Sequence, residues 1–299
     1  YFQNTDDKQG VAVEVANAVL VSKRFQVLSS YKKELNDIFR AKFEEVDFLT
    51  ESPTVVSKVN QWVSEKTKGK IDTAISSIPR NTLLYIMNAV YFKGDWEAKF
   101  DELKTKQLPF YNFGKTEKPV DTMKGKSEYN YTESEELKST VLELPYKGKE
   151  FSMVIILPHE REGLNDLLAV LTADKLENAV SQLASRTVQV TLPKFKLESS
   201  FSLVEPIKSL GAPSIFQGNA NFTGISDNVE LMVSDVTHKA VVEVNEEGAE
   251  AASFTSVSFT ARAGVFRKHI PFKVDHPFLF FIRSKKSGLI LFLGTVNEL

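Results

Sequence analysis

The sequence of 299 residues contains no cysteine, which excludes disulfides, thiol catalysis and cysteine-ligated zinc. Histidine is scarce as well, and its four positions are scattered along the chain: His159, His238, His269 and His276. The 37 basic and 39 acidic residues nearly cancel and leave a net charge of −2. The chain therefore has no global field that would favour binding to nucleic acid or to an acidic lipid surface.

The usual sequence signatures of enzymes are missing. No G-x-S-x-G nucleophile turn, no phosphate-binding G-x-x-x-x-G-K and no dinucleotide-binding G-x-G-x-x-G occurs. The segment HEREG at 159–163 begins like a zinc-protease helix, but it lacks the second histidine one turn later. We interpret it as a polar turn, and we predict neither a catalytic site nor a metal site. No apolar run approaches the ~18 residues of a membrane span.

The sequence does contain a mixture of helical and strand periodicity. Apolar residues recur on one helical face over 27–39 and over 55–63, and further helices are expected near 164–184 and 201–210. A hairpin turn is expected at 284–288. Strand-like apolar runs, several of them apolar at every position and thus predicted to be covered on both faces, lie at 82–92, 151–157, 188–192, 230–233, 239–244, 278–282 and 289–293. No linker divides the chain, so we expect one α+β domain.

One segment does not fit this ordinary pattern. The stretch EEGAEAASFTSVSFTARAGVFRK at 246–268 is uncharged from Ala251 to Ala261 and then presents Arg262. A loop of this length inside a compact domain is uncommon and is usually functional or disordered. The stretch contains no proline, so each of its backbone N–H groups can join a sheet ladder.

Seven parts of the chain resemble the serpins, in serpin order and at serpin-like spacing. They are NQWVSEKTKGKI (60–71), NAVYFKGDWEAKF (88–100), LELPYKGKEFSMVIILP (142–158), VTLPKFKLES (190–199), ANFTGIS (220–226), VTHKAVVEVNEEGAEAA (236–252), and HPFLFFIR with LFLGTV (276–283, 291–296). The hinge and the HPFLFFIR segment look like those of secreted arthropod serpins, and most resemble tick salivary inhibitors with an arginine in the loop.

The resemblance implies an α+β serpin fold, with large mixed β-sheets, surrounding helices and a long exposed reactive-centre loop at 245–270. Serpins have several helices before a segment like VANAVLVSKRF, and here almost nothing precedes it. We therefore expect a single serpin domain over 1–299 that is incomplete at its N-terminus.

The resemblance also implies a function: irreversible suicide-substrate inhibition of serine proteases, and no enzymatic activity of its own. In serpins a protease attacks a bait bond in the loop, and the cleaved loop inserts into the main sheet and traps the acyl-enzyme. Counting fourteen residues from Gly248, as the family pattern does, makes Arg262–Ala263 the expected bait bond. The segment after it is longer than usual, so Arg267 or Lys268 could compete. All three candidates are basic, which favours a trypsin-like target.

An inserting strand alternates its side chains between two faces, and the loop can be tested against that requirement. One face is small or apolar throughout: Ala249, Ala251, Ser253, Thr255, Val257 and Phe259. The other face carries the only charge, Glu250. The expected hinge residues are Glu246, Glu247, Gly248, Ala249, Glu250, Ala251 and Ala252. Their composition favours an inhibitor over the alternative, a non-inhibitory serpin that acts as a carrier or chaperone.

Three further residues receive roles from the resemblance. Trp96 matches the tryptophan at the breach, where the loop enters the main sheet. Asn88 and His238 match the shutter, whose hydrogen bonds control sheet opening. The residues themselves also favour a structural role for His238, because it lies within an apolar strand and a hydrogen-bonded core histidine is the simpler interpretation.

Location and surface partners are indicated only by short patterns. Two Asn-x-Thr acceptors, at Asn130 and Asn221, favour a secreted, extracellular glycoprotein. The resemblance to tick serpins further implies a protein secreted in saliva, with an anticoagulant or anti-defence role in host blood. The basic pairs at 23–24 and 32–33 are most simply a solvated face, and a glycosaminoglycan site there is the alternative. We expect a monomer with no other cofactor.

Overall fold

The computed structural model describes residues 10–227, 230–246 and 269–299. The chain clusters into two compact units. The described part of unit 1 is mainly 13–92 and 196–242, and that of unit 2 is mainly 93–195 and 243–299. The expectation of a single domain over 1–299 stays a prediction. The α+β class is confirmed, because helices and mixed sheets occur together.

Unit 1 is built around a five-stranded sheet in the order β2-β1-β3-β10-β9. Its strands are β1 (Val11–Ser22), β2 (Lys42–Val46), β3 (Leu84–Gly94), β9 (Phe195–Ser202) and β10 (Val233–Val244). The helices of this part are α1 (Ser29–Asp37), α2 (Phe48–Lys66) and α5 (Val204–Ser209), with a short 3-10 helix at Pro213–Phe216.

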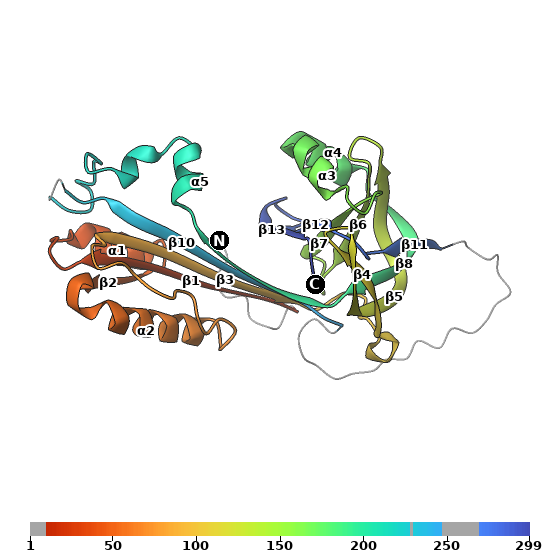
Figure 1. The fold of residues 1–299 in the computed structure, drawn as a ribbon, viewed down its shortest axis with the longest axis horizontal. Helices are drawn as coiled ribbons and strands as arrows, with labels where there is room; N and C mark the ends of the chain where they lie inside the picture. The colour runs from red at the N-terminus through yellow and green to blue at the C-terminus, as the bar shows by residue number, and fades with distance from the viewer. Residues whose placement is uncertain (1–9, 228–229, 247–268) are drawn as a thin grey trace. The chain divides into compact units, whose positions relative to one another are not determined.

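Helix α2 covers one face of this sheet, as Figure 1 shows. It begins after Asp47, whose side chain accepts a hydrogen bond from the backbone N–H of Leu49 at 3.0 Å and caps the helix. Val55, Val59 and Val63 are spaced four residues apart, so they lie on one stripe, and all three are buried. They pack with apolar residues of the sheet that share a face: Ala16, Ala18, Leu20, Tyr85, Met87, Ala89, Tyr91 and Val241.

Strands β3 and β10 are direct, parallel neighbours. Their register runs from Val233 opposite Leu84 to Val242 opposite Phe92. Parallel strands need a long crossover connection, and here the chain passes through most of unit 2 between them. Any segment placed between β3 and β10 would first have to separate this ladder.

Unit 2 contains an eight-stranded sheet in the order β11-β8-β5-β6-β7-β12-β13, with β4 paired to β5. The strands are β4 (Lys106–Asn112), β5 (Thr116–Ser134), β6 (Ser139–Pro145), β7 (Phe151–Pro158), β8 (Ala184–Pro193), β11 (Ile270–Lys273), β12 (Phe278–Ser284) and β13 (Ile290–Val296). Helices α3 (Leu164–Val170) and α4 (Ala173–Ser181) lie side by side (Figure 1), and a 3-10 helix spans Glu102–Lys104.

Several strand predictions are confirmed in unit 2. Every residue of β7 is buried, and so are six of the seven residues of β12, as expected for continuous apolar runs. Strands β12 and β13 form the expected antiparallel hairpin. Gly288 ends the turn between them with φ at +72°, a conformation that glycine adopts without steric cost.

Other predictions were wrong. The runs 230–233 and 239–244 do not form two strands: residues 230–232 lie outside any strand, and β10 is one strand from Val233 to Val244. The polar residues between the runs did not break the strand, because its two neighbours in the sheet hold the backbone. Ile38 and Phe39 are not on a buried helical face, since α1 ends at Asp37 and their side chains are 69% and 61% exposed.

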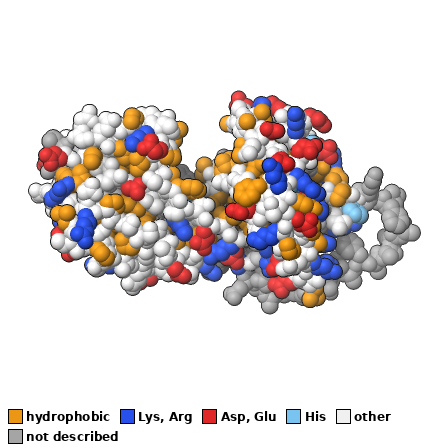
Figure 2. All heavy atoms as spheres, viewed as in Figure 1, with side chains coloured by type: hydrophobic (Ala, Val, Ile, Leu, Met, Phe, Trp, Pro, Cys, Tyr) orange, Lys and Arg blue, Asp and Glu red, His pale blue; other side chains and the backbone are white. Residues whose placement is uncertain are grey.

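The surface carries mixed charge. Figure 2 shows Lys and Arg side chains interspersed with Asp and Glu on the face in view, without a large area of one sign.

Within the described ranges, no helix is long and apolar enough to cross a membrane. In the same part of the chain, no group of three or more His, Asp or Glu side chains is arranged to hold a metal ion.

Candidate functional site

The end of β10 is anchored through Glu246, the last described residue before the segment 247–268. Its side chain is nearly inaccessible, and its residue as a whole is 4% exposed. One carboxylate oxygen lies 2.8 Å from Nζ of Lys194, and the other accepts a hydrogen bond from Oγ1 of Thr105 at 2.6 Å. The backbone N–H of Phe100 donates to the Glu246 carbonyl at 3.2 Å. Three residues from two parts of the chain, the β3–β4 connection and the end of β8, therefore hold Glu246.

The protonation of Glu246 follows from these contacts. Burial alone would raise the pKa of its carboxyl group, but the hydrogen bonds from Lys194 and Thr105 outweigh burial and lower the pKa below its ordinary value. The carboxylate is therefore ionised at neutral pH. Because a buried carboxylate is stable only with its partners in place, moving Glu246 requires breaking both contacts.

Trp96 lies beside this anchor. Its Nε1–H donates to the carbonyl of Asn245 at 2.8 Å, and its ring stacks on Tyr146 with a centroid distance of 4.6 Å and an interplanar angle of 12°. Gly94, at the end of β3, completes the contact, because a Cβ added there would lie 2.6 Å from the Tyr146 ring. The stacked pair thus fixes the backbone immediately before Glu246.

A second cluster lies within unit 1, on the two central strands. Nδ1–H of His238 on β10 donates to Oδ1 of Asn88 on β3 at 2.8 Å, since an amide oxygen can only accept. Nδ2 of Asn88 in turn donates to Oδ1 of Asn17 on β1 at 2.6 Å. The three side chains form a hydrogen-bonded row across three neighbouring strands. Burial lowers the pKa of His238, so the ring is neutral at neutral pH.

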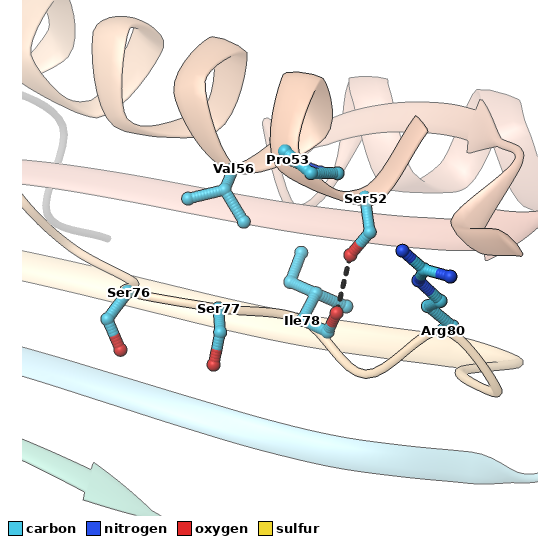
Figure 3. Close-up of a pocket in the computed structure, with 7 residues that line it drawn as sticks. All are labelled: Ser52, Pro53, Val56, Ser76, Ser77, Ile78 and Arg80. Atoms are coloured by element: carbon cyan, nitrogen blue, oxygen red, sulfur yellow. Dashed lines mark hydrogen bonds between the residues drawn. The ribbon is translucent and has the colours of Figure 1, made fainter. Parts of the chain in front are cut away.

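Unit 1 also has a shallow pocket of about 450 Å³ between α2 and the segment 76–80. Figure 3 shows its lining, which consists of Ser52, Pro53, Val56, Ser76, Ser77, Ile78 and Arg80. Ser52 Oγ donates to the carbonyl of Ile78 and ties the helix to this segment. These lining residues include no histidine and no carboxylate, so they offer hydroxyl groups without a general base.

Comparison with known proteins identifies the fold and the family. A family model described as "Serpin (serine protease inhibitor)" matches residues 2–299. The chain belongs to the serpin family. It is 41% identical to intracellular coagulation inhibitor 1 of Tachypleus tridentatus, over 99% of this chain and 71% of that protein. It is also 41% identical to Iripin-3 of Ixodes ricinus, over 99% of this chain and 76% of that protein.

The solved structure of uncleaved ovalbumin matches with a TM-score of 0.87 at 28% identity, and it covers 99% of this chain and 76% of ovalbumin. The serpin fold expected from the seven sequence segments is therefore confirmed. So is the likeness to tick serpins, through the Iripins. The family model describes serpins as serine protease inhibitors.

The structure brings some of the expected serpin residues together and leaves others outside its described ranges. Trp96 and Glu246 belong to one cluster, while Asn88 and His238 are directly hydrogen-bonded in another. The remaining expected hinge and bait residues lie outside the described residues: Glu247, Gly248, Ala249, Glu250, Ala251, Ala252, Arg262, Ala263, Arg267 and Lys268.

Sequence reasoning missed the partners of Glu246. Lys194 lies inside VTLPKFKLES, one of the serpin-like segments, so a carboxylate partner could have been sought for it. Thr105 carried no signal, because it follows a charged turn and stands 141 residues from Glu246 in the sequence.

Proposed function

We propose that this serpin is an irreversible suicide-substrate inhibitor of trypsin-like serine proteases. The protease serine Oγ attacks the carbonyl carbon of Arg262 and forms an ester with it. The peptide bond to Ala263 breaks, and the new amino terminus leaves with a proton from the protease histidine. Insertion of the loop as a new strand then traps the ester before water hydrolyses it. The direct parallel pairing of β3 and β10, ahead of a long uncharged segment, is the observation that carries this proposal.

Strand geometry supports insertion at this place. Segment 247–268 follows β10, so a strand formed from it beside β10 would run antiparallel to β10 and also to β3. One parallel ladder would then be replaced by two antiparallel ladders, which are slightly more stable per residue. The exchange adds backbone hydrogen bonds and buries one face of the new strand, so the inserted state is the more stable one.

The anchored hinge supports the same proposal. Glu246 is held by Lys194 and Thr105, and the small residues after it place no bulky side chain at the point of entry. Specific contacts at one end of the loop therefore hold the uninserted state. The amino-acid composition of the loop is compatible with a β-strand. Contacts that hold the uninserted state, followed by a segment that can form a strand, suit a trapping mechanism.

Incubation with trypsin tests the proposal. We expect a covalent adduct that survives denaturing electrophoresis at the summed mass of the two proteins, and a released peptide whose sequence begins at Ala263. Arg262→Ala should abolish the adduct, because the trypsin specificity pocket then loses its charged partner. The matched variants Arg267→Ala and Lys268→Ala should still form it.

The outcomes separate the alternatives. A loop that is clipped after Arg262 without any adduct would support a non-inhibitory carrier or chaperone. An adduct that persists in Arg262→Ala and disappears in Arg267→Ala or Lys268→Ala would move the bait bond and keep the mechanism. If trypsin neither cleaved the original protein nor formed an adduct with it, the proposed target class would be wrong.

Trypsin-like proteases of coagulation and host defence are the proposed physiological targets. An arginine bait suits the acidic specificity pocket of this class, because the guanidinium pairs bidentately with a carboxylate. One relative at 41% identity is named intracellular coagulation inhibitor 1, which supports a protease of coagulation as the target. A glycosaminoglycan partner gains no support from the basic pairs, since Lys23 and Lys32 each contact a carboxylate, of Glu51 and Glu45.

We also propose that the protein is secreted and carries a glycan at Asn221 but not at Asn130. Asn130 lies inside β5, and its Nδ2, the atom that would carry the glycan, donates to the buried Glu143 at 2.7 Å. Asn221 is exposed, and its Oδ1 accepts hydrogen bonds from the backbone N–H and the hydroxyl of Thr223.

Expression through the secretory pathway of insect cells tests this assignment. Thr223→Ala removes the Asn221 acceptor and should lower the mass of the secreted protein by one glycan. Thr132→Ala removes the Asn130 acceptor and should leave the mass unchanged apart from the substitution. A glycan on Asn130 of the folded, secreted protein, found by peptide mass spectrometry, would contradict the assignment.

A further inference from the structure

His276 lies in the short link between β11 and β12 and is 7% exposed. Both of its ring nitrogens have a close partner. Nδ1 is 2.7 Å from Oδ1 of Asp275, and Nε2 is 2.9 Å from the carbonyl oxygen of Pro158 at the end of β7. The ring therefore bridges two parts of unit 2 that are more than a hundred residues apart in the sequence.

Both partners can only accept a hydrogen bond. A backbone carbonyl has no proton to give, and Asp275 is ionised. Burial alone would raise the pKa of Asp275, but the hydrogen bonds from His276 and Lys273 lower it to about 2. A neutral imidazole has one N–H, so it would leave the lone pair of its other nitrogen facing an acceptor oxygen. Only the imidazolium cation donates on both sides.

The surrounding charges are compatible with a cation at this place. Lys273 lies 2.8 Å from Oδ2 of Asp275, so the carboxylate is shared between the Lys273 ammonium group and the His276 ring. From β4, the backbone N–H of Tyr111 donates to the Asp275 carbonyl at 2.8 Å. On the β7–α3 loop, His159, Glu160 and Arg161 are exposed, and the Arg161 guanidinium lies 3.6 Å from the centre of the Tyr111 ring. Asp275 is thus the carboxylate that faces the ring.

The link that contains His276 connects β12 to β11, a strand with few backbone hydrogen bonds. In the described part of the chain, β11 has four residues and pairs with β8 alone, so it is an edge strand with a single short ladder. It directly follows the segment 247–268 in the sequence. After this strand, the backbone N–H of Val274 donates to the carbonyl of Thr191 on β8 at 2.9 Å. His276 then ties the link to β7 through the Pro158 carbonyl.

We propose that protonated His276 is a pH-dependent latch that fastens β11, and that loss of the ring proton loosens this strand. When the ring loses its proton, one of the two hydrogen bonds turns into a contact between a lone pair and an acceptor oxygen. A charge-assisted hydrogen bond is lost at the same step, which corresponds to roughly a tenfold rise in the open population of β11. The latch is firm at acidic pH and loose at alkaline pH.

Nitrogen NMR of the full chain labelled with 15N-histidine tests the protonation state. With four histidines, the His276 signals are assigned by their loss in His276→Gln. We expect the two ring nitrogens of His276 to have similar shifts, as in imidazolium, at about pH 6. A pair of dissimilar shifts at that pH, as in a neutral tautomer, would overturn the proposal.

Amide hydrogen exchange tests whether β11 opens more often when His276 loses its ring proton. Protection factors of the β11 amides, corrected for the intrinsic effect of pH, should fall roughly tenfold between about pH 6 and about pH 8.5. His276→Gln should show low protection at both values, and the exposed neighbour variant His159→Gln should behave like the original protein. Protection that is high and independent of pH in all three proteins would overturn the latch.

The consequence for inhibition rests on the proposed function and is measured separately. The fraction of protein that forms the trypsin adduct after prolonged incubation should fall at alkaline pH, and this fall should disappear in His276→Gln. If no adduct forms at any pH, the proposed function fails while the NMR and exchange results still decide the state of His276. A decline with pH that is equal in both proteins would remove His276 as its cause.

Discussion

A single charge on one face of the loop should turn this serpin from an inhibitor into a substrate. In Ser253→Arg, the new guanidinium lies on the face whose other members are all small or apolar. If that face is buried on insertion, an unpaired charge costs several kcal/mol, and each 1.4 kcal/mol slows insertion about tenfold relative to hydrolysis. Trypsin should then cleave the loop and escape, and the amount of inhibitor consumed for each protease inactivated should rise at least tenfold.

The matched control is Ser256→Arg, three residues further along and on the opposite face. It adds the same side chain to the same loop, so any effect of charge on protease binding is shared. We expect this variant to form the adduct nearly as well as the original protein. Equal trapping by both variants would argue against strand insertion. If only Ser256→Arg lost trapping, the loop would insert with its faces reversed.

The elements that were predicted correctly are those whose side chains repeat with a clear period. Helix α2 follows from valines four residues apart, and β7 and β12 follow from uninterrupted apolar runs. Strand β5 was missed although it is 19 residues long. Its sequence, TEKPVDTMKGKSEYNYTES, has many charged residues and no apolar alternation, so its strand is determined by the neighbours that pair with it rather than by its own pattern.

In the candidate site, too, the sequence predicted some residues and missed others. Trp96, Asn88 and His238 could be chosen from the serpin-like segments, but their partners could not be read from local sequence. Asn17 and Tyr146 also lie in serpin-like segments, but nothing in those segments pairs them with Asn88 and Trp96, and only the fold brings them together. The contact of Glu246 with Lys194 depends on how β10 and β8 end, and that is a property of the fold. Long-range pairing is the part that a single sequence does not reveal.

A further charged network lies inside the eight-stranded sheet, around Glu143 on β6. The side chain of Glu143 is 2% exposed. One of its oxygens lies 2.7 Å from a terminal nitrogen of Arg283 and 2.8 Å from Oγ of Ser152. The other lies 2.7 Å from Nδ2 of Asn130 and 3.3 Å from Nζ of Lys285. Four donors from three neighbouring strands and the turn after β12 therefore converge on one buried carboxylate.

Replacing Glu143 with glutamine should destabilise the protein strongly. The variant keeps the shape but removes the charge, and its amide N–H₂ group then faces the donors of Asn130 and Lys285. Arg283 would remain without its buried counter-charge, and breaking a buried pair in this way costs about 3–5 kcal/mol. Urea unfolding monitored by circular dichroism should show this loss as a lower midpoint. The matched control is Glu128→Gln, an exposed carboxylate on the neighbouring strand β5, which should change stability by less than about 0.5 kcal/mol.

The pH dependence provides an independent check on Glu143. Burial alone would raise its pKa, but the hydrogen bonds from Arg283, Asn130 and Ser152 lower it to about 2 from the ordinary 4.5. Because the folded state binds this proton less tightly than the unfolded chain, the contribution is fully present above about pH 4.5 and is lost as the pH falls toward about 2. The difference between the pKa of about 2 in the folded protein and the ordinary value of 4.5 corresponds to roughly 3 kcal/mol of folding stability. The stability gap between the original protein and Glu143→Gln should therefore narrow across this window. A gap that stays constant from neutral pH down to about pH 2 would show that the carboxylate charge is not what holds these strands together.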